Sequence, residues 1–145
     1  TDDAGLRTDK KADIFIVVAF RILPEKFLSI PNICSINLHG SILPQYRGAA
    51  PIQWALMNGD KVTGVSVFKI EKYVDSGKII SQKQIVIEDS DNFYSLSEKL
   101  SKLGAEILID ASANLRTTAS TSGRSSPASA ADCRKVVRPG VTVED

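Results

Sequence analysis

Apolar residues alternate between the spacing of strands and the spacing of helices over residues 12–110. A continuous β-branched run at 13–19, DIFIVVA, predicts a strand buried on both faces, as in a parallel sheet. Further apolar runs predict strands at 33–38, 63–70 and 78–87, and the second of these three alternates strictly between apolar and other residues. Four strands are therefore expected.

Three helices are predicted between and after these strands. Proline is favourable as the first residue of a helix, so Pro24 and Pro51 are predicted to begin the first two helices. Gly59 is suited to end the second helix. Ser90 or Asp91 is expected to cap the last helix. Its apolar residues recur at helical spacing and are predicted to face the core: Phe93, Leu96, Leu100, Leu103 and Ile107.

The order of these elements predicts an α/β domain with a mostly parallel sheet, in which the short link between the last two strands allows an antiparallel pair. In such folds ligands bind beyond the carboxyl ends of the strands. Three segments are expected there, namely 20–24, 37–48 and 71–77.

Composition divides the chain into three parts. Residues 1–11 are a polar lead-in, and residues 12–110 hold the apolar periodicity. In the segment 111–131, 17 of 21 residues are Ala, Ser, Thr, Gly or Pro. Such a segment buries too little apolar surface to offset the entropy lost on ordering, so 111–145 is predicted to be a disordered tail.

Composition and charge exclude several classes of protein. The chain has 145 residues, 43% of them hydrophobic, and its net charge is +1, as expected of one soluble domain. The longest apolar stretch, 14–20, is too short to cross a membrane, and no secretory leader is expected. Cys34 and Cys133 are far apart and His39 is the single histidine, so neither a disulfide framework nor a zinc site is predicted.

Charge also gives no support for binding of nucleic acid by the ordered part. Residues 12–110 hold ten Lys and Arg against eleven Asp and Glu, whereas such proteins cluster positive charge. Five lysines are spread along the sequence and are expected on a solvated surface: Lys61, Lys69, Lys72, Lys78 and Lys83.

Three polar residues at or just past predicted strand ends are candidates for catalysis. His39 is suited to proton transfer near neutral pH, and a carboxylate such as Asp75 would stabilise its charged form. Asn37 offers an uncharged amide donor for a developing oxyanion. From these residues alone, a surface or turn role for the histidine stays open.

The segment 35–70, SINLHGSILPQYRGAAPIQWALMNGDKVTGVSVFKI, resembles the folate-dependent formyltransferases. Its Asn-x-His and Ser-x-Leu-Pro motifs and the Val-Asp-Ser-Gly at 74–77 occur in the order found in that family. The run at 46–54 is most similar to the branch whose acceptor is initiator methionyl-tRNA. The resemblance covers about 12–110 and implies a Rossmann-like domain with helices on both faces of its sheet.

This resemblance implies transfer of a formyl group from 10-formyltetrahydrofolate to the amino group of methionine on initiator tRNA, without a metal. Asn37 and protonated His39 match residues that stabilise the oxyanion, and Asp75 matches the residue that keeps the histidine charged. Two segments match the folate pocket: Phe20, Arg21, Ile22 and Leu23, and Glu71, Lys72, Tyr73 and Val74. The loop after His39 supplies the remaining candidates for substrate contact: Ser41, Leu43, Pro44, Arg47 and Gly48.

Some of these residues have a structural interpretation as well. Residues 41–44 are expected to shape the turn that holds His39, and Arg47 either binds substrate or pairs with a carboxylate. Trp54 is predicted to pack in the core, and Cys34 is predicted to be a small buried apolar residue.

The chain departs from the family at both ends. Relatives begin with further strands and, in the tRNA-dependent branch, continue into a barrel domain, so we expect a partial catalytic domain that folds weakly or aggregates alone. Two alternatives stay open: a formyltransferase for an amino-sugar nucleotide or another small amine, and an inactive folate-binding fragment. The resemblance implies a monomer when complete and is compatible with the cytoplasm, a mitochondrion or a plastid.

Overall fold

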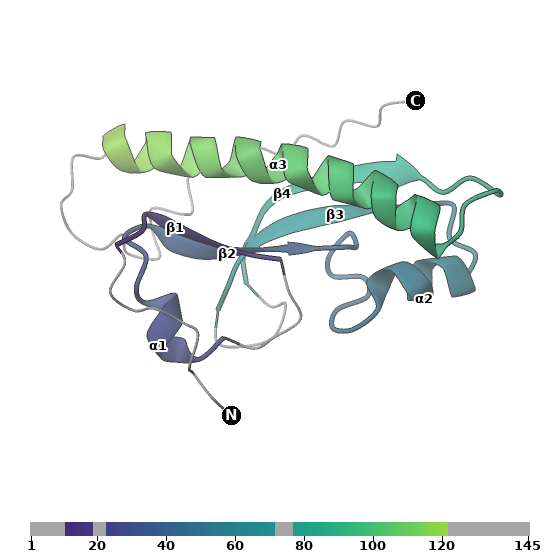
Figure 1. Cartoon of the computed structure of the whole chain (residues 1–145), viewed down its shortest axis with the longest axis horizontal. Helices are drawn as coiled ribbons and strands as arrows, with labels where there is room; N and C mark the ends of the chain where they lie inside the picture. The colour runs from purple at the N-terminus through teal and green to yellow at the C-terminus, as the bar shows by residue number, and fades with distance from the viewer. Residues whose placement is uncertain (1–10, 19–22, 72–76, 122–145) are drawn as a thin grey trace.

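The computed structural model describes residues 11–18, 23–71 and 77–121, which form one four-stranded sheet with helices on both sides (Figure 1). The strands are β1 (Ile14–Val17), β2 (Cys34–His39), β3 (Val62–Lys69) and β4 (Ile79–Val86). The helices are α1 (Glu25–Leu28), α2 (Pro51–Met57) and α3 (Phe93–Thr121). These seven elements agree in type and order with those predicted from the sequence.

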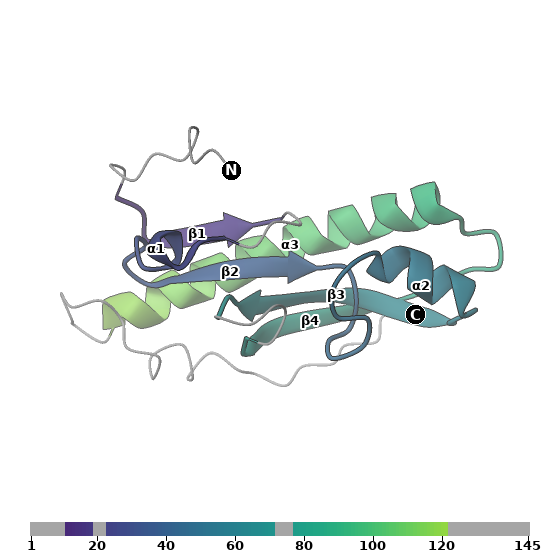
Figure 2. The same cartoon turned by 90° about the horizontal axis from the view of Figure 1, so that it is seen from below.

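The sheet is mixed rather than mostly parallel. Its strand order is β1-β2-β3-β4, in which β1 and β2 are parallel and the other two neighbouring pairs are antiparallel. The predicted antiparallel pair, β3 with β4, is present, but β2 with β3 is antiparallel too. The segment that joins β2 to β3 contains α2 and lies beyond the end of β2, and it does not run back along the sheet (Figure 2). The chain therefore re-enters the sheet from the end at which it left.

Strand β1 differs from the prediction of a strand buried on both faces. Ile16 is 49% exposed and Val18 is 61% exposed. Within the described sheet β1 pairs with β2 alone, so one of its edges and part of one face have no neighbour among the described residues. The apolar run at 13–19 predicted the strand correctly but not its degree of burial.

Helix α3 lies along one face of the sheet, and α1 lies on the other (Figures 1 and 2). The side chain of Asn92 caps α3, since its Oδ1 accepts hydrogen bonds from the amides of Tyr94 (2.9 Å) and Ser95 (3.1 Å). The prediction that Ser90 or Asp91 caps this helix was therefore wrong, because the capping residue is one or two positions further along the chain. Asp91 instead accepts hydrogen bonds from the Ser95 hydroxyl and from Lys99, at 2.8 Å each.

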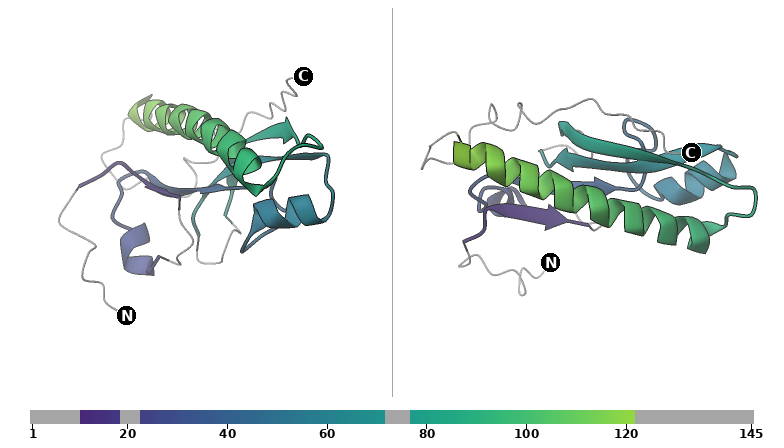
Figure 3. Two further views of the ribbon diagram at one scale, coloured as in Figure 1. Left: turned by 45° about the vertical axis from the view of Figure 1, so that its right-hand side comes forward. Right: turned by 90° about the horizontal axis from the view of Figure 1, so that it is seen from above.

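Residues 111–121 continue α3, which runs 29 residues to Thr121 (Figure 3), so the expectation of disorder was wrong for them. The buried stripe continues at the same spacing through Ile107, Ala111 and Leu115, which are 1–3% exposed. Alanine is the strongest helix former, and one leucine at the right spacing anchors the added turns to the sheet. Residues 122–145 lie outside the described part of the chain.

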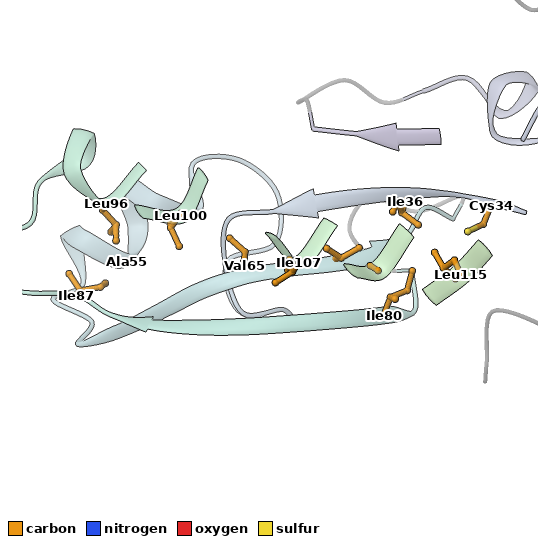
Figure 4. Close-up of a cluster of buried hydrophobic side chains, with 12 residues drawn as sticks. Cys34, Ile36, Ala55, Val65, Ile80, Ile87, Leu96, Leu100, Ile107 and Leu115 are labelled. Carbon is orange, nitrogen blue, oxygen red and sulfur yellow. The ribbon is translucent and has the colours of Figure 1, made fainter. Parts of the chain in front are cut away.

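The core is the layer between α3 and the sheet (Figure 4). Cys34 and Ile36 of β2 and Ile80 of β4 face Leu115 and its neighbours on the helix. At the other end Ala55 of α2 packs with Leu96, Leu100 and Ile87. Cys34 is thus the small buried apolar residue that was predicted, at 4% exposure.

Gly104 brings α3 unusually close to β2. A Cβ atom built on Gly104 would lie 2.5 Å from Cδ2 of Leu38, a distance that real Cβ atoms essentially never show. Leu38 is the residue between Asn37 and His39. The absence of a side chain on Gly104 therefore sets how near the helix approaches the strand that carries both candidate residues.

Helix α2 lies beyond the end of β2, beside the first turns of α3 (Figure 2). It begins at Pro51, as predicted, and Gly59 follows its end with φ of +66°, a conformation that glycine adopts without strain. Trp54 was predicted to be in the core but is 48% exposed. The neighbouring Ala55 is the fully buried residue of this short helix and takes the place that faces the core. In α1, Pro24 is the residue before the helix rather than its first residue.

Candidate active site

Strand β2 separates the apolar core from the candidate residues. Cys34, Ile36 and Leu38 belong to the core that faces α3. Because successive side chains of a strand point to opposite faces, Asn37 and His39 lie together on the face away from α3, about 7 Å apart along the strand. The structure therefore brings these two predicted residues together.

Ser35 lies on the same face of β2, two residues before Asn37. Its side chain is 3% exposed, and within the described residues its hydroxyl has no hydrogen-bond partner. Buried hydroxyls are normally paired with protein or with ordered water. An orphaned hydroxyl in line with Asn37 and His39 therefore marks this face as one that can accept a polar ligand.

The imidazole of His39 is held by the loop that follows it. Its side chain is buried, and its Nε2 lies 2.8 Å from the main-chain oxygen of Tyr46. A carbonyl oxygen only accepts hydrogen bonds, so Nε2 carries a proton and donates it.

Tyr46 is itself anchored at the end of α2. Its hydroxyl donates to Oδ2 of Asp60 at 2.6 Å and accepts from Nδ2 of Asn58 at 2.9 Å. The hydrogen bond to the Asp60 carboxylate raises the pKa of Tyr46, because it favours the protonated phenol. Tyr46 has φ of 51°, an uncommon value for a residue other than glycine.

The loop after His39 is also fastened to the sheet through Ser66 of β3. The Ser66 hydroxyl donates to the Ser41 carbonyl (2.6 Å) and accepts from the Leu43 amide (3.0 Å) and from Nε2 of Gln82 (2.9 Å). Ser41 is 1% exposed, and its own hydroxyl donates to the Gln45 carbonyl at 2.5 Å. These contacts agree with the structural interpretation of residues 41–44 as the turn that holds His39.

Segment 71–77 was expected at the same edge of the sheet as His39, and the structure corrects this for its first residue, Glu71, whereas residues 72–76 lie outside the described residues. Lys69 pairs with Ile36 while Ser66 pairs with His39, so antiparallel β3 ends beside the beginning of β2. The amide of Ile70 donates to the Ser35 carbonyl at 2.9 Å. Glu71 therefore leaves the sheet beside Ser35, at the opposite end of β2 from His39.

The remaining predicted residues divide into two groups. Seven lie outside the described residues: Phe20, Arg21, Ile22, Lys72, Tyr73, Val74 and Asp75. Of the others, Glu71, Pro44 and Arg47 are exposed, Leu23 and Gly48 are half-buried, and Leu43 is buried. Sequence reasoning assigned no role to Ser66, Asp60 or Tyr46, although a serine between two core valines was a signal that the hydroxyl needs a partner.

Two further properties concern the described part of the chain as a whole. Over residues 11–18, 23–71 and 77–121, no three His, Cys, Asp or Glu side chains come together as a metal-binding group. None of the described helices combines the length and the apolar character needed to span a membrane.

Comparison with known proteins identifies the family of the chain. The family model described as formyl transferase matches residues 4–112. The chain is 57% identical over 96 residues to methionyl-tRNA formyltransferase of Thermodesulfovibrio yellowstonii, covering 66% of this chain and 31% of that protein. It is 45% identical over 108 residues to the protein of the same name from Prochlorococcus marinus subsp. pastoris, covering 74% of this chain and 33% of that protein. The chain thus spans about a third of the length of these curated relatives.

Solved structures of formyltransferases share the fold. Phosphoribosylglycinamide formyltransferase of Campylobacter jejuni is similar with a TM-score of 0.62 and 32% identity, over 72% of this chain and 55% of that chain. The formyltransferase PseJ of Anoxybacillus kamchatkensis, solved with UDP-4,6-dideoxy-4-formamido-L-AltNAc and tetrahydrofolate, gives a TM-score of 0.64 and 25% identity. Here the match covers 72% of this chain and 56% of PseJ.

Proposed function

Since this chain belongs to the formyl transferase family, we propose that it is a catalytic part of an enzyme that formylates the methionine carried by initiator tRNA. The formyl donor is 10-formyltetrahydrofolate, and the compartment is the cytoplasm. The observation that carries the proposal is the placement of Asn37 and His39 on one face of β2, in a chain 57% identical to a relative named for this reaction.

The reaction places demands on the chain that these residues meet. The amine nitrogen bonds to the formyl carbon, the bond from that carbon to the folate nitrogen breaks, and the proton lost by the amine ends on the folate nitrogen. Negative charge develops on the formyl oxygen in between, and fixed donors stabilise such charge strongly. The Asn37 amide and the His39 ring supply these donors, and we assign to Asp75 the role of partner to the ring, as the resemblance implies.

The residues present fit a folate-derived donor. The orphaned hydroxyl of Ser35 offers a polar contact on the same face as Asn37, and Glu71 leaves the sheet beside it. We assign the donor to residues 20–23 and 71–74, as the resemblance implies, and methionyl-tRNA to the loop that contains Arg47 and Gly48.

Formyl transfer from 10-formyltetrahydrofolate to methionyl initiator tRNA tests this proposal. We expect Asn37→Ala and His39→Ala each to lower the rate by about 100-fold or more, the usual effect of removing one oxyanion donor. The matched control is Asn32→Ala, because Asn32 is exposed and its side chain donates to Asp13 at the other end of β2. Rates for Asn37→Ala and His39→Ala equal to that of the control would refute the assignment.

A second acceptor class deserves a direct comparison because PseJ, solved with a formamido-sugar nucleotide, shares the fold. Competition between methionyl-tRNA and an amino-sugar nucleotide for the same donor identifies the preferred acceptor. Binding of tetrahydrofolate without transfer to either acceptor, unchanged in His39→Ala, would instead support the inactive folate-binding fragment.

A further inference from the structure

We infer that Tyr46 is a positioning residue for His39, acting through its main-chain carbonyl, which Asp60 holds in place by way of the tyrosine hydroxyl. The part of this inference that concerns catalysis rests on the proposed function. The contacts themselves form a continuous chain of hydrogen bonds from Asp60 to the imidazole.

The first step is the fixed ring of His39. Its Nε2 donates to the Tyr46 oxygen at 2.8 Å, and the side chain is only 9% exposed. A buried imidazole whose Nε2 is engaged in this way is restricted in both tautomer and orientation. The position of the Tyr46 carbonyl oxygen therefore contributes to how the ring is oriented.

The second step is what fixes that carbonyl. Tyr46 lies in a turn with φ of 51°, where a tyrosine needs support from its surroundings. Its hydroxyl supplies this support through Asp60 at 2.6 Å and Asn58 at 2.9 Å. Both partners lie just past the end of α2, and the Asp60 amide donates to the Ala55 carbonyl at 3.0 Å. The anchor is therefore built on a helix whose Ala55 is fully buried in the core.

The third step separates this anchor from the fastening at Ser66. Ser66 binds the first part of the loop, at residues 41 and 43, whereas Asp60 binds it further along the chain, at residue 46. Loss of the tyrosine hydroxyl leaves the first attachment intact. The expected defect is therefore confined to the Tyr46 carbonyl, which accepts the hydrogen bond from Nε2 of His39.

The single histidine of the chain makes the test direct, because every imidazole signal in a spectrum of ¹⁵N-histidine-labelled protein comes from His39. For the neutral ring of the wild-type chain we expect the Nε2–H tautomer, with a proton that exchanges slowly with water. In Tyr46→Phe we expect that exchange to be about threefold to tenfold faster, the effect of losing one net hydrogen bond, with appearance of the other tautomer.

Matched variants make the result specific. Tyr94→Phe removes the same atom from a tyrosine that is 83% exposed and is expected to leave the His39 signals unchanged. Asp60→Ala should reproduce Tyr46→Phe, and it replaces that variant if Tyr46→Phe does not fold. Asp60→Asn keeps an acceptor oxygen for the tyrosine hydroxyl and should resemble wild type.

Wild-type His39 signals in folded Tyr46→Phe or Asp60→Ala, or equal changes in Tyr94→Phe, would overturn the inference. This result is independent of turnover, so it can fail while His39→Ala still abolishes formyl transfer. It can also hold when no transfer is found, in which case the proposed function fails and the positioning of the ring stands.

Discussion

Removal of one buried hydroxyl, in Ser66→Ala, should destabilise the chain far more than its size suggests. Ser66 is fully buried, and its hydroxyl makes three hydrogen bonds, to the Ser41 carbonyl, the Leu43 amide and Gln82. After the substitution Gln82 still has the Leu43 carbonyl at 3.0 Å, but the Leu43 amide loses its acceptor inside the protein. The damage therefore falls mainly on the backbone of the loop that follows His39.

The magnitude follows from these contacts. A buried donor left unpaired costs about 1–3 kcal/mol, and the lost bond to the Ser41 carbonyl adds about 0.5–1.5 kcal/mol. We therefore expect a loss of about 2–4 kcal/mol in the free energy of unfolding. For a slope of about 2 kcal/mol/M, the urea midpoint falls by about 1–2 M.

Urea unfolding followed by far-UV circular dichroism measures this change. The control is Ser101→Ala, which removes an exposed hydroxyl that donates to the Ser97 carbonyl within α3, and which should stay within about 0.5 kcal/mol of wild type. A Ser66→Ala chain as stable as the control would refute the reasoning, because it would mean that the loop does not depend on this hydroxyl.

Two further predictions concern α3. Leu115→Ala should lower the free energy of unfolding, measured in urea, by about 2 kcal/mol or more, because Leu115 is 2% exposed. Ile109→Ala, at a position that is 69% exposed, should lower it far less. Equal losses would contradict the packing of residues 111–121 on the sheet. Hydrogen bonds from Lys99, the Glu88 amide and Ser95 lower the pKa of Asp91 from 3.8 to about 2. The ionised form of Asp91 therefore stabilises the fold above about pH 4, and this contribution is lost as the pH falls toward 2. Unfolding midpoints measured from pH 6 to pH 2 should therefore decline less steeply for Asp91→Asn than for wild type or for Asp110→Asn, and parallel curves would contradict the role of the Lys99 contact.

Much of the fold could be predicted because local patterns determine it. The apolar run at 33–38 predicted β2 to within one residue at each end, and Pro51 and Gly59 marked the limits of α2. The mixed sheet could not be predicted in this way, because strand direction depends on the path of the connecting segments in space. Burial of Trp54 and order beyond Ala111 were misjudged, because both depend on which partner each helix meets.

The candidate site shows the same division. That Asn37 and His39 share a face follows from their spacing on a strand, and the structure agrees. The partners that hold the histidine are 7 to 25 residues apart in the sequence and meet only after the turn has formed. A pattern read along the chain carries no information about such contacts, so Tyr46, Asp60 and Ser66 emerged only from the structure.

The close approach of Gly104 to Leu38 limits how the chain can vary through evolution. Leu38 projects toward α3, while its neighbours Asn37 and His39 project the other way from the same short length of backbone. A side chain at position 104 would meet the end of the Leu38 side chain, so Leu38 would have to shift on the strand that carries both polar groups. Selection on Asn37 and His39 therefore extends to the opposite face of the sheet, where a change at position 104 is expected together with an adjustment at position 38.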